Sequence, residues 1–315
     1  MHHLISISGG KDSTALLLYA IEKQIEPMTV CFADTGHEHQ QTYDYVRELE
    51  RLTGTPIKWV RANFKAQMAV RRENIQAKWS ASGVPQARID RALEMLVPTG
   101  NPFLDMCMLK GRFPSSMARF CTQELKHKPI DDVVMKLLQH DDAVMSWQGV
   151  RAQESRSRAK LQMWEITDPW PRLWIYRPLL HWTHEEVFAM HRRHGIPWNP
   201  LYEQGMGRVG CMPCIMASKP ELREIAKRFP EEVERVAAWE RIVAEVSKRG
   251  LSSFFASDKT PGDHVGRSDQ AAPGIHEVMD WALTSRGGRQ YDLISVSESQ
   301  SEDAPTCASV YGLCE

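Results

Sequence analysis

The chain lacks the features that would place it in a membrane or make it a general binder of polyanions. No apolar run approaches the roughly 20 residues that a membrane-spanning helix needs, and the net charge of the 315 residues is only −1. The first predicted strand starts almost at Met1, without room for a secretory signal. We therefore expect a cytoplasmic protein with no membrane partner. Locally basic stretches at 71–91 and 151–160 keep nucleic acid open as a substrate.

The glycine-rich segment near the N-terminus matches neither the Walker loop nor the dinucleotide pattern G-x-G-x-x-G. It follows a short apolar strand, opens into the helical run 14–20, and reads Ser6-Ile7-Ser8-Gly9-Gly10-Lys11-Asp12-Ser13. Such a turn places backbone N–H groups and the positive end of a helix around one small volume. The sequence therefore predicts a pyrophosphate loop made by Ser6, Ser8, Gly9, Gly10, Lys11, Asp12 and Ser13, with Lys11 and Asp12 also as catalytic groups.

Apolar runs that alternate with helical stretches indicate the fold class. Runs at 28–33, 56–61 and 142–150 follow the first strand, and a helical stretch at 40–52 separates two of them. This alternation predicts an α/β fold, a doubly wound parallel sheet with helices on both faces. We expect a nucleotide-binding domain at 1–250, whose later part is mostly helical. A C-terminal extension at 251–315 would then hold a helical patch at 275–284 and a polar, cysteine-containing tail.

Two more loops stand where predicted strands end, and ligands of such sheets bind at the carboxyl ends of the strands. The first loop is acidic and could hold Mg²⁺ or a ribose. The second is basic, and its guanidinium groups suit phosphate or sulfate. Solvated surface turns are the alternative for both. The acidic candidates are Asp34, Thr35, Gly36 and Glu38, and the basic-loop candidates are Arg151, Glu154, Ser155 and Arg158, with Arg151 also as a catalytic group.

Seven cysteines in a chain of this kind favour metal or redox use over disulfides. Cys31 lies inside a predicted strand and is most simply a core residue. Cys211-x-x-Cys214 has a spacing at which two thiolates can bind one metal centre, and Cys107 and Cys121 would complete a set of four. Four thiolates suit a four-iron cluster or, as the lesser alternative, a tetrahedral zinc. A simple dithiol without metal is the third interpretation.

Helix-capping patterns mark the second half of the chain. Thr183-x-x-Glu186 predicts the start of a helix that runs to about His194. We interpret three histidines on this helix as surface residues, namely His184, His191 and His194. A second capping box, Ser218-x-x-Glu221, predicts another helix directly after the Cys211 motif, and a longer one should follow at 230–248.

Five motifs in order resemble the phosphoadenosine phosphosulfate reductase family of the adenine-nucleotide alpha-hydrolase superfamily, and the resemblance extends from Leu4 to about Gly250. The resemblance implies a Rossmann-like doubly wound parallel sheet, an adenine nucleotide in the crevice with Lys126 among its contacts, and in many members a cysteine-bound [4Fe-4S] cluster. The motifs are Ser6 to Ser13, Asp34-Thr-Gly-x-Glu38, Arg119-Phe-Cys121-Thr-x-x-Leu-Lys126-x-x-Pro129, Gly149-x-Arg151-x-x-Glu154-Ser155-x-x-Arg158 and Cys211-x-x-Cys214.

The sequence departs from the family pattern in two places. Cluster-containing adenylyl-sulfate reductases have adjacent cysteines, but Phe120 precedes Cys121 here. Cys107 is therefore our candidate for the fourth ligand, and Cys307 or Cys314 is the alternative. True sulfonucleotide reductases also have degraded phosphate loops, whereas this loop is intact, which favours ATP. In this respect the chain is similar to DNA phosphorothioation sulfurtransferases, the sulfate adenylyltransferase small subunit and cluster-dependent tRNA thiolation enzymes.

Three functions follow as hypotheses. The first is cleavage of ATP at its α phosphate with Mg²⁺, followed by cluster-dependent transfer of sulfur to an acceptor such as nucleic acid. The second is reduction of a sulfonucleotide to sulfite by a tail thiolate, Cys307 or Cys314, with a thioredoxin-like reductant. The third is a nucleotide-binding regulatory protein whose cluster senses redox state. A sulfur donor and assembly into a homo-oligomer are further expectations.

Overall fold

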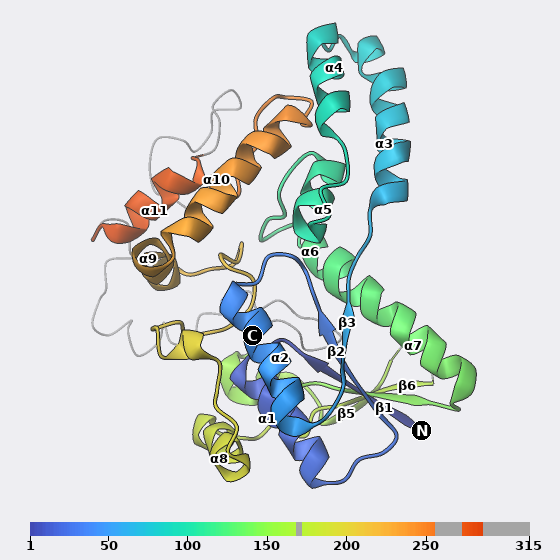
Figure 1. Ribbon diagram of the computed structural model, residues 1–315, viewed down its shortest axis with the longest axis vertical. Helices are drawn as coiled ribbons and strands as arrows, with labels where there is room; N and C mark the ends of the chain where they lie inside the picture. Colours follow the sequence, from blue (N-terminus) through green and yellow to red (C-terminus); the bar gives the residue numbers. More distant parts are fainter. Residues whose placement is uncertain (168–171, 256–272, 286–315) are drawn as a thin grey trace.

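The protein is built on a mostly parallel sheet, seen in a computed structural model that describes residues 1–167, 172–255 and 273–285 (Figure 1). The strand order is β3-β2-β1-β4-β6-β5, and only β5 runs antiparallel to its neighbour. Leu4 of β1 lies opposite Thr29 of β2 and Ser146 of β4. The strands are β1 (His2–Ile7), β2 (Met28–Ala33), β3 (Ile57–Val60), β4 (Val144–Trp147), β5 (Trp164–Ile166) and β6 (Leu173–Tyr176).

Helices cover both faces of this sheet, which confirms the predicted doubly wound α/β fold. Because successive residues of a strand point to opposite faces, Ile5 packs with the helices of one face and Leu4 with the helix of the other. Cys31 belongs to the second face, so its assignment to the core is confirmed. The first face carries α1 (Lys11–Glu22), α2 (Gln40–Thr53) and α8 (His184–His194), and the second carries α7 (Lys128–His140).

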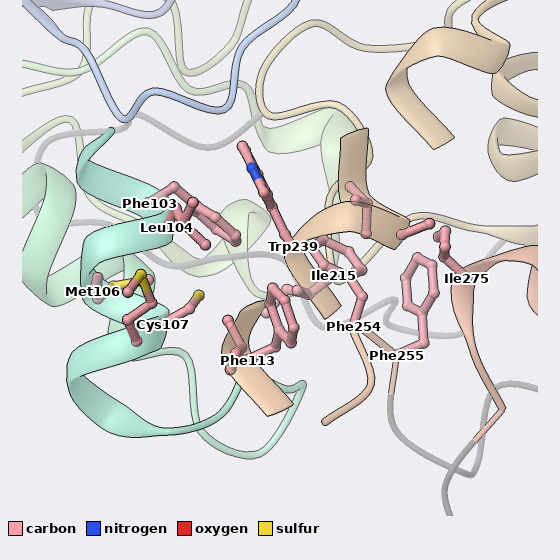
Figure 2. Packing of buried hydrophobic residues seen from close by; sticks show 14 of the residues in the cluster. Phe103, Leu104, Met106, Cys107, Phe113, Ile215, Trp239, Phe254, Phe255 and Ile275 are labelled. Atoms are coloured by element: carbon pink, nitrogen blue, oxygen red, sulfur yellow. The ribbon is translucent and has the colours of Figure 1, made fainter. Parts of the chain in front are cut away.

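A separate helical part surrounds its own hydrophobic core. Figure 2 shows Phe103, Met106 and Cys107 of α5 in this core together with Trp239 of α10 and Phe254. The core takes residues from both sides of position 250, and the predicted division into domains there stays a prediction. The helices are α3 (Lys65–Lys78), α4 (Gln86–Met95), α5 (Pro102–Lys110), α9 (Lys219–Arg228), α10 (Pro230–Glu245) and α11 (Ile275–Leu283).

The basic stretch at 71–91 lies on α3 and α4 and uses two of its arginines within the fold. Arg88 donates a hydrogen bond to the carbonyl of Ala244 in the last turn of α10, at 3.0 Å. Arg72 donates to the carbonyl of Leu96 after α4, at 3.0 Å. Carbonyl groups at helix C-termini lack intrahelical donors, so these arginines hold α3, α4 and α10 together.

Several local predictions need correction. His191 is fully buried. The Ser218 hydroxyl makes no cap hydrogen bond, and the Glu221 side chain pairs with Arg208. The apolar run that ends at Leu179 and Leu180 is a strand only as far as Tyr176. The helix of Thr183 and its capping box are confirmed, with the αL residue Gly195 at its end. None of the helices in the described ranges combines the length and apolar character needed to cross a bilayer.

Candidate functional site

Three loops meet at one edge of the sheet because β2, β1 and β4 are neighbours and parallel. The loops follow Ile7, Ala33 and Trp147, the last residues of those strands. The strands β2 and β3 lie on one side of β1, and the next strand along the chain, β4, lies on the other side of β1. Such a reversal opens a crevice at the carboxyl ends of the strands, and the three predicted loops all face it.

The loop after β1 is held by its own serine side chains. The Ser13 hydroxyl accepts a hydrogen bond from the Ser8 N–H at 3.2 Å and donates to the Gly10 carbonyl at 3.0 Å. Gly9 has a φ of +78°, and a Cβ there would lie 2.9 Å from the Thr42 side chain. Glycine is therefore required at this position by both conformation and space. The helix α1 starts directly after the loop, at Lys11.

Two cations and one carboxylate lie at the N-terminus of α1. The Asp12 carboxylate is 0% exposed, and the Lys11 ammonium lies 2.9 Å from its Oδ2. The Arg151 guanidinium pairs with the other oxygen, Oδ1. The three groups carry a net charge of +1, and the helix end adds a partial positive charge. The structure thus brings together Lys11, Asp12 and Arg151 in a setting suited to a phosphate.

Three side chains that the sequence analysis did not assign to the site contact this loop. The Asn199 amide donates to the Gly9 carbonyl at 3.1 Å, and Nε2 of His191 lies 2.9 Å from the Lys11 carbonyl. The Tyr202 hydroxyl accepts the Lys11 N–H at 3.1 Å. The sequence held one signal that His191 is buried. Val187, Met190 and His191 are spaced as i, i+3 and i+4 and therefore share the buried face of α8.

In the loop after β4, one carboxylate contacts both the backbone and a guanidinium group of the loop. The Glu154 carboxylate accepts the Arg151 N–H at 2.7 Å and pairs with the Arg158 guanidinium. The Ser155 hydroxyl accepts the Arg158 N–H at 3.1 Å. Glu154 therefore fixes the loop, and Arg151 is the member that reaches α1.

The acidic loop after β2 is closed by a shared hydroxyl. Tyr43 lies 3.0 Å from Asp34 and 2.9 Å from Glu38, and the Thr35 hydroxyl donates to Glu38 at 2.7 Å. Burial raises the pKa of Tyr43, and the charges of Glu38 and Asp34 raise it further. Mg²⁺ usually takes one or two carboxylates together with substrate phosphates. Asp34 and Glu38 fit that use, and a magnesium site here stays a prediction.

Three of the four predicted metal ligands line one cavity of about 50 Å³, namely Cys121, Cys211 and Cys214. The cavity exceeds the space that one water molecule requires. Arg119, Lys126 and Arg208 also line it. Within the described ranges no three His, Cys, Asp or Glu side chains are already arranged around one metal position. The soft thiol donors and the surrounding cations nevertheless fit zinc or an iron–sulfur cluster.

The two loop cysteines have different electrostatic surroundings. Burial raises the pKa of Cys211 well above its ordinary value, and the charge of Glu38 adds to this while Lys126 opposes it. Burial alone would lower the pKa of Arg208, but Cys214 and Glu221 raise it overall. Arg208 therefore supplies positive charge beside Cys214.

Cys107 does not line this cavity but lies in the hydrophobic core (Figure 2). Burial raises the pKa of Cys107 well above its ordinary value, and the nearby charge of Cys121 adds to the effect. Cys107 is thus a neighbour of Cys121, and its role as the fourth ligand stays a prediction. The alternatives, Cys307 and Cys314, lie outside the described residues.

The thiol cavity and the phosphate loop are neighbours. Lys126 and Gly210 line the thiol cavity and also a smaller cavity beside Ser8 and Glu38. Lys126 stands on a π-helical turn, η2 (Gln123–His127). Such turns often occur at functional sites. Main-chain pairing of Glu38 with Cys211 joins the acidic loop directly to the cysteine loop.

The chain is similar to several known proteins. The family model "Phosphoadenosine phosphosulfate reductase domain" matches residues 2–217. An uncharacterized 37.8 kDa protein of Escherichia phage 186 is 51% identical over 99% of this chain and 96% of its own length. An adenosine 5'-phosphosulfate reductase of Bacillus subtilis is 30% identical over 68% of this chain and 73% of that protein. The phosphoadenylyl-sulfate reductase structure from Candida auris has a TM-score of 0.43 and 18% identity, covering 67% and 82% of the two chains.

Proposed function

The chain belongs to the phosphoadenosine phosphosulfate reductase domain family, whose model spans residues 2–217 of the 315, and on that premise we propose that it is an ATP-dependent sulfurtransferase. In this proposal the protein binds ATP at the phosphate loop, cleaves it between the α and β phosphates, and transfers sulfur to the adenylylated substrate. The single observation that carries the proposal is the trio of Lys11, Asp12 and Arg151 at the start of α1, next to a cavity lined by three thiols.

The first step is adenylylation. A substrate oxygen attacks the α phosphorus, the bond to the oxygen that bridges the α and β phosphates breaks, and pyrophosphate leaves with that oxygen. Negative charge grows on the leaving pyrophosphate as this bond breaks. Lys11, Arg151 and the N-terminus of α1 supply fixed positive charge for it, and such preorganised electrostatic stabilisation is a main source of catalysis in phosphoryl chemistry. Asp34 and Glu38 are the carboxylates that would hold Mg²⁺.

The second step replaces AMP by sulfur. A sulfur nucleophile attacks the substrate atom that carries the adenylylated oxygen, a bond from that atom to sulfur forms, the bond to the oxygen breaks, and AMP leaves with this oxygen. An iron–sulfur cluster, when bound, would hold or supply this sulfur. Cys121, Cys211 and Cys214 would be its ligands in the cavity, and Cys107 the fourth. Lys126 lies between the two cavities and would direct a negatively charged intermediate from one to the other.

Reduction of a sulfonucleotide is the second candidate. It is favoured by the reductase from Bacillus subtilis, which shares 30% identity with this chain. In this reaction a thiolate attacks the sulfur of the bound sulfonucleotide. The nucleotide leaves as AMP or as AMP phosphorylated at its 3' position, and a thiol reductant then releases sulfite. The intact phosphate loop with two cations argues for ATP, because a sulfonucleotide presents no β and γ phosphates.

The product released decides between the candidates. Anaerobically purified protein is incubated with Mg²⁺ and ATP in one series, and with adenylyl sulfate and a dithiol reductant in another. Pyrophosphate from ATP supports the sulfurtransferase, and sulfite from adenylyl sulfate supports the reductase. Arg151→Gln should abolish the pyrophosphate signal. Its control, Arg193→Gln, removes an exposed arginine that pairs with Glu22 at the far end of α1. Binding of nucleotide without either product would refute both and favour a regulatory protein.

A further inference from the structure

Tyr202 contacts the phosphate loop at the group that an anion would use. Its hydroxyl accepts the Lys11 N–H at 3.1 Å, and the Lys11 ammonium lies 5.1 Å from the centre of its ring. Tyr202 ends the short turn η5 (Pro200–Tyr202). It therefore reaches the loop from a segment 191 residues further along the chain.

The Lys11 N–H is a donor at the very start of a helix. In α1 the N–H of Thr14 is bonded to the Gly10 carbonyl at 3.0 Å, so the N–H groups before it have no acceptor within the helix. Such N–H groups are the ones that hold phosphate at a helix N-terminus. A single N–H cannot make full hydrogen bonds to both a phosphate oxygen and a hydroxyl. Binding of phosphate at this donor therefore requires the Tyr202 hydroxyl to leave.

The remaining contacts behind the loop do not compete with an anion. Asn199 and His191 are both 0% exposed, and each faces a backbone carbonyl of the loop rather than an N–H. A phosphate, which only accepts hydrogen bonds when fully ionised, has no interaction to gain with those carbonyls. They can thus keep the loop in shape while Tyr202, which is only half-buried, moves.

From this geometry we infer that Tyr202 is a positioning residue that sets the affinity of the loop for polyphosphate, because its hydroxyl holds the place of a phosphate oxygen. The inference rests on the proposed binding of ATP or pyrophosphate at this loop. Binding of polyphosphate is weakened because the Lys11 N–H must first give up its hydrogen bond to the Tyr202 hydroxyl, so removal of this hydroxyl alone should strengthen binding. A residue that merely supported the fold would have the opposite effect.

The test uses the holoprotein and isothermal titration calorimetry with pyrophosphate and Mg²⁺. Tyr202→Phe keeps the ring beside Lys11 but removes the competing acceptor. We expect its Kd for pyrophosphate to fall about fivefold, which corresponds to one ordinary hydrogen bond. Tyr19→Phe is the matched control, because it removes a hydroxyl from the later part of α1, and its Kd should equal that of the wild type.

The outcomes separate this inference from the proposed function. An unchanged or higher Kd in Tyr202→Phe, with normal binding by the wild type, would overturn the inference alone. A wild-type protein that binds neither pyrophosphate nor ATP would overturn the proposed function and the inference with it. A second measurement guards against a folding defect. With ¹⁵N-lysine labelling, the Lys11 amide signal should differ between wild type and Tyr202→Phe, and the two signals should coincide once pyrophosphate is saturating.

Discussion

Arg151 and Asp12 stand 139 residues apart in the sequence and form a buried ion pair at the N-terminus of α1. The pair joins the loop after β4 to the loop after β1, the two loops on either side of the point where the strand order reverses. Lys11 shares the same carboxylate. The pair therefore fixes the distance between the two cationic groups that would hold a polyphosphate.

Neutralising Asp12 should destabilise the protein strongly. Asp12→Asn keeps the shape of the side chain but leaves two buried cations without a counter-charge. Loss of one partner from a buried ion pair costs about 3–5 kcal/mol, and we expect a loss of unfolding free energy of this order in urea titrations. Asp44→Asn is the control, because Asp44 makes an exposed pair with Arg47 at 3.1 Å and should cost less than about 1 kcal/mol. Equal effects of the two substitutions would contradict the central role of the pair.

Substitution of Gly149 should displace the start of α1. A Cβ on this residue would lie 3.1 Å from the Asp12 carbonyl oxygen and 3.2 Å from Ser13 Cα, which are backbone atoms that cannot turn aside. We expect Gly149→Ala to cost about 1–3 kcal/mol of stability and to weaken binding of ATP. Gly207→Ala serves for comparison, since a Cβ there meets nothing within 4 Å. Thermal unfolding and calorimetry measure the two effects, and wild-type behaviour of Gly149→Ala would contradict the close packing.

Single substitutions of cysteine by alanine should show which thiols are metal ligands. We expect Cys107→Ala, Cys121→Ala, Cys211→Ala and Cys214→Ala each to lose bound metal, by more than the roughly 10- to 100-fold that loss of an outer-shell partner causes. Cys31→Ala, in the sheet core, should keep the metal. Iron, zinc and sulfide analysis after anaerobic purification measures this. Retention of metal in Cys107→Ala but not in Cys211→Ala would assign the fourth ligand to Cys307 or Cys314.

His191 should make stability depend on pH. Burial lowers the pKa of His191 below its ordinary 6.5, although hydrogen bonds to the Lys11, Ile196 and Pro197 carbonyls and the charge of Asp12 oppose the shift. Below about pH 6.5 the unfolded chain therefore binds more protons at this residue than the folded chain. Stability then rises with pH, and the contribution of a neutral His191 is lost on acidification.

His191→Gln tests this contribution, because glutamine cannot titrate but can still donate to the Lys11 carbonyl. The wild type should lose stability between pH 7 and pH 5 faster than the variant, by at most about 1.4 kcal/mol per pH unit. Chemical denaturation at several pH values gives the difference. His181→Gln, at an exposed position, should leave the slope unchanged, and a slope in His191→Gln equal to that of the wild type would refute the prediction.

The fold and the loop positions could be predicted because they depend on local sequence. The run at 28–33 is β2 to the residue, and Thr183 and Gly195 bound α8 as their capping chemistry requires. The position of the glycine loop between a strand and a helix was likewise recognisable, and its binding of phosphate stays a prediction. These signals need no knowledge of distant contacts.

The supports of the loop could not be predicted, because they come from long-range packing. Asn199 and Tyr202 act on residues about 190 positions earlier, and nothing in their own neighbourhood marks that use. His191 was misassigned because a lone histidine on a polar helix is usually exposed. The place of Cys107 in a hydrophobic core likewise depends on long-range packing, that of α5 against α10.

The main-chain bridge between Glu38 and Cys211 limits how this protein can diverge. Side chains on paired strands alternate between two sides, so one inserted residue in either loop would turn the carboxylate or the thiol to the opposite side. Substitutions around these two positions can be tolerated, whereas changes of loop length cannot. Alignments of more distant members should therefore show variable residues but a constant spacing from Asp34 to Glu38 and from Gly210 to Cys214.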